Sequence, residues 1–222
     1  KFITKQLIDK GWSEDKKYCL TDEQGKRFLL RVSPIEQYDR KKSEYELMSQ
    51  VATLGVPMCK PLEFGTSDEG VYSIQTWIDG VDVEENVHNL TCEEQYSYGF
   101  EAGRILKEIH KIPAPKGIED WEIYFNRKAD RKIKMYEECP IKYENGQAFI
   151  DYINAHRYLL RGRPRTYQHG DYHIGNMMIG NDKRLYIIDF NRNDFGDPWE
   201  EFNRIVWLSL IHISEPTRLG MI

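Results

Sequence analysis

Three oxygen-bearing side chains in the last third of the sequence have types and spacings suited to moving a phosphoryl group. Asp171 lies in the segment HGDYHIGN at 169–176, Asn176 ends that segment, and Asp189 follows the apolar run at 185–188. Phosphoryl transfer needs a carboxylate that orients the attacking hydroxyl and hard oxygen ligands that hold Mg²⁺. Asp171 suits the first role, and Asn176 and Asp189 suit the second. Each residue alone could be a turn former, but the combination favours a phosphate-transfer site.

A metal-dependent phosphoesterase is a competing interpretation of the same segment. Strand alternation would place His169, Asp171 and His173 on one side of the backbone, as in many metal sites. The other histidines form no recognisable ligand pair, and His110 falls on the apolar face of the helical stretch 102–111, which favours a packed core imidazole. We therefore expect His169 to be a structural hydrogen-bonding residue that shapes the loop, whereas His173 fits either interpretation.

The elements before this segment can be predicted from turn residues and hydrophobic periodicity. Two strand-like runs flank a turn containing Asp22 and Gly25, which is typical of a β-hairpin. Thr91 and Glu94 are spaced as a capping box at the start of a helix. We expect strands at 17–20, 27–32 and 71–78, and helices at 39–54, 91–111, 121–136 and 146–160.

The catalytic segment resembles that of the aminoglycoside phosphotransferases and their choline kinase relatives, which share the protein kinase fold. The resemblance covers the chain up to Trp207. It implies an α+β, two-lobed fold with an antiparallel β-rich nucleotide-binding lobe at 1–78 and a mostly helical, incomplete catalytic lobe at 79–207. It also implies that Asp171 is the catalytic base, that Asn176 and Asp189 bind Mg²⁺, and that ATP is the cofactor.

The resemblance assigns further residues to the nucleotide. Arg31 stands in a strand where a kinase carries the lysine that grips the phosphates, and its planar fork differs from lysine in geometry. Its carboxylate partner should lie on the following helix, with Glu44 as first choice and Glu46 as second.

Backbone groups should complete the nucleotide site. Amides near Ser13 are implied as phosphate contacts, although a plain polar turn explains that segment equally well. The carbonyl of Thr76 and the amide of Ile78 are implied as contacts to the adenine edge. Glu201 stands where the family carries an aspartate that braces the catalytic loop, and its greater length leaves that role open.

The acceptor is expected to be a hydroxylated small molecule. The acidic stretch at 191–202 would suit a polycationic aminoglycoside through electrostatic steering, which favours an antibiotic resistance enzyme. Choline, homoserine and macrolide kinases remain alternatives, as does a nucleotide-binding pseudokinase without transfer activity. Oligomeric state cannot be inferred.

Composition excludes other classes of partner. Arg161, Arg163 and Arg165 form a basic cluster, but the net charge is −5, so we expect no nucleic-acid partner and treat them as a solvated linker or as partners of nearby carboxylates. No apolar run reaches membrane-spanning length, which predicts no membrane partner. The four cysteines lack CxxC spacing, which favours a reduced, cytoplasmic setting.

Both ends of the sequence suggest a fragment. The chain begins with Lys1 rather than methionine, and no signal-like segment follows. The stretch LSLIHISEPTR at 208–218 resembles the in-frame translation of a transposon end and adapter used in DNA library preparation. We therefore expect residues 208–222 to be non-native. Recovering the same codons after 207 with a different library chemistry would disprove this.

Overall fold

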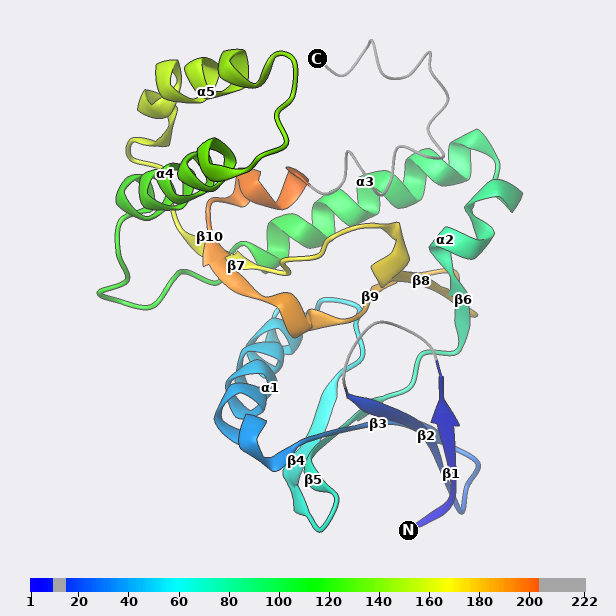
Figure 1. Ribbon diagram of the computed structural model, residues 1–222. Coiled ribbons are helices and arrows are strands. Elements are labelled where there is room, and N and C mark those ends of the chain that lie inside the picture. Colours follow the sequence, from blue (N-terminus) through cyan, green and yellow to red (C-terminus); the bar gives the residue numbers. More distant parts are fainter. Residues whose placement is uncertain (10–14, 204–222) are drawn as a thin grey trace.

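The computed structural model describes residues 1–9 and 15–203, which form two lobes (Figure 1). The strands of the first lobe are β1 (Phe2–Ile8), β2 (Lys16–Asp22), β3 (Arg27–Ser33), β4 (Pro61–Ser67) and β5 (Gly70–Thr76). They form one antiparallel sheet in the order β1-β2-β3-β5-β4. The predicted β-rich first lobe is therefore present.

The β2–β3 hairpin is fixed by its turn. The side chain of Asp22 accepts hydrogen bonds from the amides of Gln24 and Lys26 at 3.0 and 2.8 Å, and Gly25 adopts a left-handed φ of +79°. This turn chemistry sets the register of the two strands. Lys17 consequently lies opposite Arg31, on the same face of the sheet.

A single long helix, α1 (Tyr38–Thr53), follows a short 3₁₀ turn and packs on this sheet. It confirms the helix predicted at 39–54. Met48 and Val51 are buried, and the ring of Tyr45 lies 5.4 Å from that of Phe64 on β4. The apolar residues at helical spacing thus face the sheet and the core, as the sequence pattern requires.

The helices of the second lobe are α2 (Val83–Asn86), α3 (Cys92–Ile109), α4 (Trp121–Glu138) and α5 (Gly146–Ala155). The predicted capping box of α3 is present, with the Glu94 amide 3.2 Å from Thr91 Oγ1 and the Thr91 amide 2.8 Å from a Glu94 carboxylate oxygen. The helix predicted at 146–160 is too long. His156 leaves helical geometry at φ −109° and ψ 6°, and a 3₁₀ turn follows.

Short strands carry the predicted catalytic segment. These are β6 (Gly80–Asp82), β7 (Thr166–Gln168), β8 (Met177–Gly180), β9 (Leu185–Ile187) and β10 (Asp194–Gly196). They form one sheet in the order β6-β8-β9 and a separate β7-β10 pair. None of the helices in the described part of the chain is both long and apolar enough to span a membrane.

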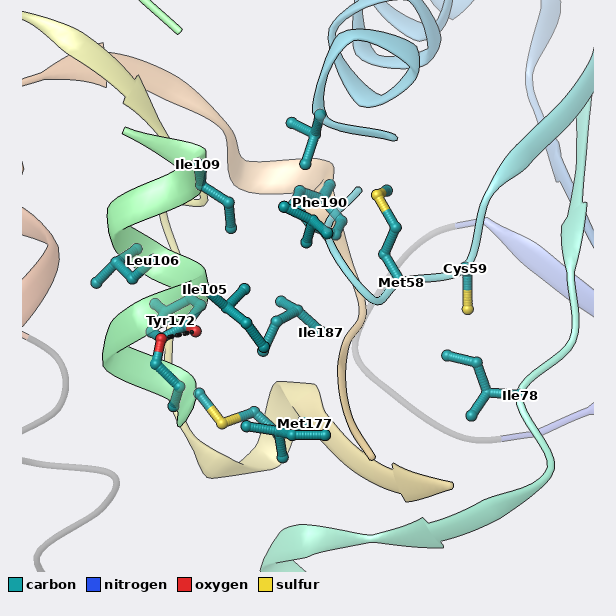
Figure 2. Close-up of a cluster of buried hydrophobic side chains, with 14 of the residues drawn as sticks. Met58, Cys59, Ile78, Ile105, Leu106, Ile109, Tyr172, Met177, Ile187 and Phe190 are labelled. Carbon is teal, nitrogen blue, oxygen red and sulfur yellow. Dashed lines mark hydrogen bonds between the residues drawn. The ribbon is translucent and has the colours of Figure 1, made fainter. Parts of the chain in front are cut away.

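One hydrophobic core joins the two lobes. Met58, from the segment between α1 and β4, packs near Ile187 and Phe190, while Ile105 and Ile109 approach from α3 (Figure 2). Met58 and Ile187 also form a parallel β-bridge. Strand β9, which leads to Asp189, is therefore anchored against the first lobe.

Candidate active site

The loop after β7 is held in an unusual backbone shape. Gly170 has a left-handed φ of +79°, and a Cβ placed there would lie 1.9 Å from the carbonyl oxygen of Arg192. His169 is fully buried, with Nε2 2.9 Å from the Ile188 carbonyl, and its Nδ1 accepts the Asp171 amide hydrogen at 3.3 Å. Burial lowers the pKa of His169, against the opposing effect of the Glu201 charge, so the neutral ring fits these bonds. The predicted loop-shaping role of His169 is confirmed.

Glu201 braces this loop despite its extra length. Its two carboxylate oxygens accept hydrogen bonds from the amides of His169 and Gly170 at 2.8 and 2.7 Å. The Glu201 side chain is 1% exposed, and His110 Nε2 lies 3.6 Å from one of its oxygens. The buried carboxylate thus satisfies two loop amides that would otherwise lack a partner. The His110 side chain is 12% exposed, so it is the largely buried imidazole that was predicted, and it lies next to this brace.

Asp171 lies within a group of polar side chains. Asn176 Nδ2 donates to the carbonyl of Asp171 at 2.9 Å and to its Oδ2 at 3.2 Å. His173 Nε2 is 3.7 Å from Oδ2, and Arg192 Nη1 is 3.7 Å from Oδ1. The Asp171 side chain is 16% exposed, so it remains accessible to a substrate. This arrangement fixes a carboxylate at the surface of the second lobe.

Asn176 and Asp189 are brought together by the pairing of β8 with β9. The amide of Ile188, the residue before Asp189, donates to the carbonyl of Asn176 at 3.0 Å. Asp189 adopts a left-handed φ of 65°, an uncommon conformation that turns the chain sharply at the strand end. Asn176 engages its described neighbours through Nδ2, which leaves its amide oxygen for a cation. These hard oxygen donors fit Mg²⁺.

A zinc-type ligand set is not found in the described residues, where no group of three or more His, Cys, Asp or Glu side chains is arranged to hold a metal. His173 Nδ1 instead accepts a hydrogen bond from the Gly175 amide at 3.1 Å. The phosphoesterase alternative therefore lacks its expected ligands within residues 1–9 and 15–203.

Arg31 reaches the second lobe but does not pair with the expected glutamate. Its Nη1 donates to Asp189 at 3.0 Å, and its Nε and Nη2 donate to Asp15 at 3.2 and 3.0 Å. Glu44 instead forms ion pairs with Arg40 and Lys41, and Glu46 is exposed. The prediction of Glu44 or Glu46 as the direct partner is wrong, because Asp15, immediately before β2, occupies that position.

The sequence analysis did not identify Asp15 and Lys41 as residues of the site. Lys41 Nζ lies 3.0 Å from Asp15 and 3.1 Å from Glu44, so it links α1 to the sheet. The available signal for Asp15 was its place two residues before Lys17, the residue opposite Arg31, since residues two apart point to the same face of a strand. Burial and the charge of Arg31 lower the pKa of Lys17, which fits its place beside that guanidinium.

The Asp15 carboxyl should make stability sensitive to acid. Burial raises its pKa, but the Ser33 hydrogen bond and the charges of Arg31 and Lys41 outweigh burial and bring the pKa from 3.8 to about 2. Because the folded pKa is the lower one, the stabilisation is complete above pH 4 and is lost as pH falls toward 2. The difference corresponds to about 2 kcal/mol. Urea denaturation of wild type and Asp15→Asn from pH 5 to 2 should show a gap between the two proteins that closes with acid; a constant gap would contradict this.

The remaining predicted nucleotide contacts lie where the lobes join, or outside the described residues. Thr76 ends β5, and Ile78 is buried in the connection to β6. Their carbonyl and amide contacts to adenine stay predictions. Ser13 lies outside the described residues, as does the segment 208–222.

The acidic stretch is largely engaged within the protein. Asp197 makes a two-point ion pair with Arg163 at 2.6 and 2.7 Å, and Glu200 pairs with Lys128. Arg165 donates to the carbonyl of Phe195 at 2.6 Å. Arg163 is therefore a carboxylate partner, one of the two roles expected for the basic cluster. Most carboxylates of this stretch are therefore paired within the protein and do not attract a cationic acceptor, since Glu201 also bonds to the loop amides.

The sequence profile of the phosphotransferase enzyme family matches residues 5–220. The chain belongs to this family. It is therefore a kinase-type, small-molecule phosphotransferase with an alcohol group as acceptor. The match includes part of the segment 208–222, whose non-native origin stays a prediction.

Solved structures confirm the protein kinase-like two-lobed fold of this phosphotransferase. A ternary complex of APH(2")-IIa with streptomycin and ATP is 19% identical, with a TM-score of 0.62, over 90% of this chain and 70% of that chain. The ADP-bound aminoglycoside phosphotransferase APH(2'')-Ib is 18% identical, with a TM-score of 0.66, over 91% and 70%. APH(3'')-Id from Streptomyces rimosus is 13% identical, with a TM-score of 0.62, over 97% and 81%. No curated protein matches the phosphotransferase.

Proposed function

We propose that this phosphotransferase moves the γ-phosphate of ATP to a hydroxyl of an aminoglycoside-type small molecule. The observation that carries the proposal is the meeting of Asp171, Asn176 and Asp189 at one site, with Arg31 reaching Asp189 from the other lobe. In this proposal residues 1–78 bind the nucleotide and residues 79–207 hold the catalytic groups.

The roles follow from the chemistry of each side chain. Asp171 orients the acceptor hydroxyl and takes its proton as the new oxygen–phosphorus bond forms and the bond to the β-phosphate oxygen breaks. Asn176 and Asp189 hold Mg²⁺, which supplies charge neutralisation at the phosphates when bound. Arg31 holds the phosphates. Protein positioning of this kind accounts for most of the catalysis expected in phosphoryl transfer.

The proposed acceptor class draws on the streptomycin complex named above and on a polar hollow beside the catalytic loop. Its lining includes Gly170, Arg192 and Asp194. Because Arg192 also approaches Asp171, an acceptor in this hollow would lie beside the proposed base. Asp194 is exposed and is one of the few carboxylates of the acidic stretch left for an amine.

Thermal melting with and without Mg²⁺-ATP tests the nucleotide site. At a hundredfold excess over the dissociation constant, binding should stabilise the chain by about 2.7 kcal/mol. For a chain of this size the melting temperature should rise by roughly 5 to 10 °C. Asp189→Ala should abolish the rise, whereas Asp194→Ala, which removes an exposed carboxylate nearby, should preserve it.

The two main alternatives give different results. A pseudokinase would show the rise but release no ADP with any acceptor, aminoglycosides included. A cooperative melt of wild type without any rise would contradict the nucleotide site itself.

A further inference from the structure

We propose that Asp15, rather than a carboxylate of helix α1, is the positioning residue for Arg31. The inference rests on the proposed function, in which Arg31 holds the nucleotide phosphates. It concerns which acidic residue fixes the direction of that guanidinium, and therefore which part of the fold controls the phosphate contact.

The contacts of Arg31 divide its guanidinium into two edges. Nε and Nη2 both donate to Asp15 Oδ2, at 3.2 and 3.0 Å, whereas Nη1 donates to Asp189 at 3.0 Å. The side chains of Arg31 and Asp15 are 9% and 3% exposed, and that of Asp189 is 34% exposed. Asp15 thus holds the buried edge, and the other edge points to the accessible metal-binding carboxylate. A planar guanidinium that is hydrogen-bonded along one edge has a fixed orientation.

Asp15 is itself held from two sides. Ser33 Oγ donates to Asp15 Oδ1 at 2.7 Å, and Lys41 Nζ donates to Oδ2 at 3.0 Å. Ser33 belongs to the same strand as Arg31, so the hairpin that carries the cation also fixes its carboxylate. Asp15 lies immediately before β2, which pairs with the strand of Arg31, and Lys41 adds a contact from α1.

Glu44 is one step removed from the phosphate cation. It pairs with Arg40 at 2.9 Å and with Lys41 at 3.1 Å, one turn away on the same helix. The charges therefore alternate from Glu44 through Lys41, Asp15 and Arg31 to Asp189. In protein kinases the helix carboxylate contacts the phosphate cation directly, so helix position controls activity. Here Asp15 stands between the helix and the cation.

Binding measurements with ATP and with adenosine test this assignment by calorimetry in the presence of Mg²⁺. Adenosine lacks phosphates, so a disturbed Arg31 should weaken ATP binding alone. Asp15→Asn should weaken ATP binding by about tenfold, equivalent to about 1.4 kcal/mol, with adenosine affinity unchanged. Glu44→Gln should change ATP affinity by less than about twofold, because Glu44 contacts Lys41 rather than Arg31 and Lys41 keeps its contact with Asp15. In an Arg31→Met background, Asp15→Asn should cause no further loss of ATP affinity, because Asp15 acts through Arg31.

Three results would overturn the assignment: an ATP loss in Glu44→Gln as large as that in Asp15→Asn, an equal loss of adenosine affinity in Asp15→Asn, or an additive loss in the Arg31→Met background. If Asp15→Asn does not fold, Ser33→Ala replaces it, since this change removes the Ser33 hydrogen bond to Asp15 Oδ1 and keeps all charges. It should weaken ATP binding a few-fold and leave adenosine binding unchanged, and an unaltered ATP affinity would count against Asp15. Failure of the wild type to bind ATP would instead refute the proposed function.

Discussion

Asp171→Asn is expected to lower turnover by on the order of 10² to 10⁴ while leaving ATP affinity nearly intact. The amide keeps the size of the carboxylate and can still accept the hydrogen bond from Asn176, so the loop geometry should survive. What is lost is the group that takes the acceptor proton. Release of ADP with an aminoglycoside panel gives the turnover, and calorimetry gives the ATP affinity.

Asp182→Asn is the matched control, because it neutralises an exposed carboxylate of the same lobe, in the turn between β8 and β9, that does not line the hollow beside the catalytic loop. Its turnover should stay close to that of wild type. Unchanged turnover in Asp171→Asn would remove Asp171 from the mechanism. An equal loss of ATP affinity would instead show that the residue supports the nucleotide site.

Glu201→Gln is expected to damage both stability and catalysis. The amide nitrogen of glutamine cannot accept a hydrogen bond, so one of the two loop amides, of His169 or Gly170, would lose its buried partner. The cost should be about 2 to 4 kcal/mol in unfolding free energy, or roughly 5 to 15 °C in melting temperature. Because Asp171 follows this loop directly, displacement should also lower turnover on the order of 10²-fold.

Glu200→Gln separates this effect from a general loss of charge. Glu200 pairs with Lys128 at a partly exposed position, where an ion pair contributes up to about 1 kcal/mol. Thermal melting and ADP release on both variants would decide between them. Similar losses in the two would mean that Glu201 has no special role in bracing the loop.

The shared core explains how residues of both lobes stay aligned. The amide of Ile187 donates to the carbonyl of Pro57 at 2.9 Å, and Ile187 is fully buried. This hydrogen bond joins strand β9 to the segment that follows α1. The residue that makes it, Ile187, lies two positions before Asp189. This connection places Asp189 within reach of Arg31.

Local features of the fold could be predicted because they depend on short-range hydrogen bonds. The Thr91 and Glu94 capping box, the Asp22 turn and the helix at 39–54 each involve residues within a few positions of one another. Phosphotransfer chemistry was also recognisable, since Asp171, Asn176 and Asp189 lie in one short stretch.

Long-range partners were decided by the tertiary structure. Several carboxylates could neutralise Arg31. In the folded chain Asp15 lies 3.0 Å from Arg31, whereas Glu44 on α1 pairs with Lys41 at 3.1 Å. Likewise, the extra length of Glu201 does not prevent it from bracing the catalytic loop. Its backbone position lets both carboxylate oxygens accept hydrogen bonds from the loop amides. The sequence by itself determined the kinds of groups at the site and their local turns. Only the tertiary structure decided which charges meet, because ion pairing requires contact within a few ångströms and no spacing along the chain specifies that distance.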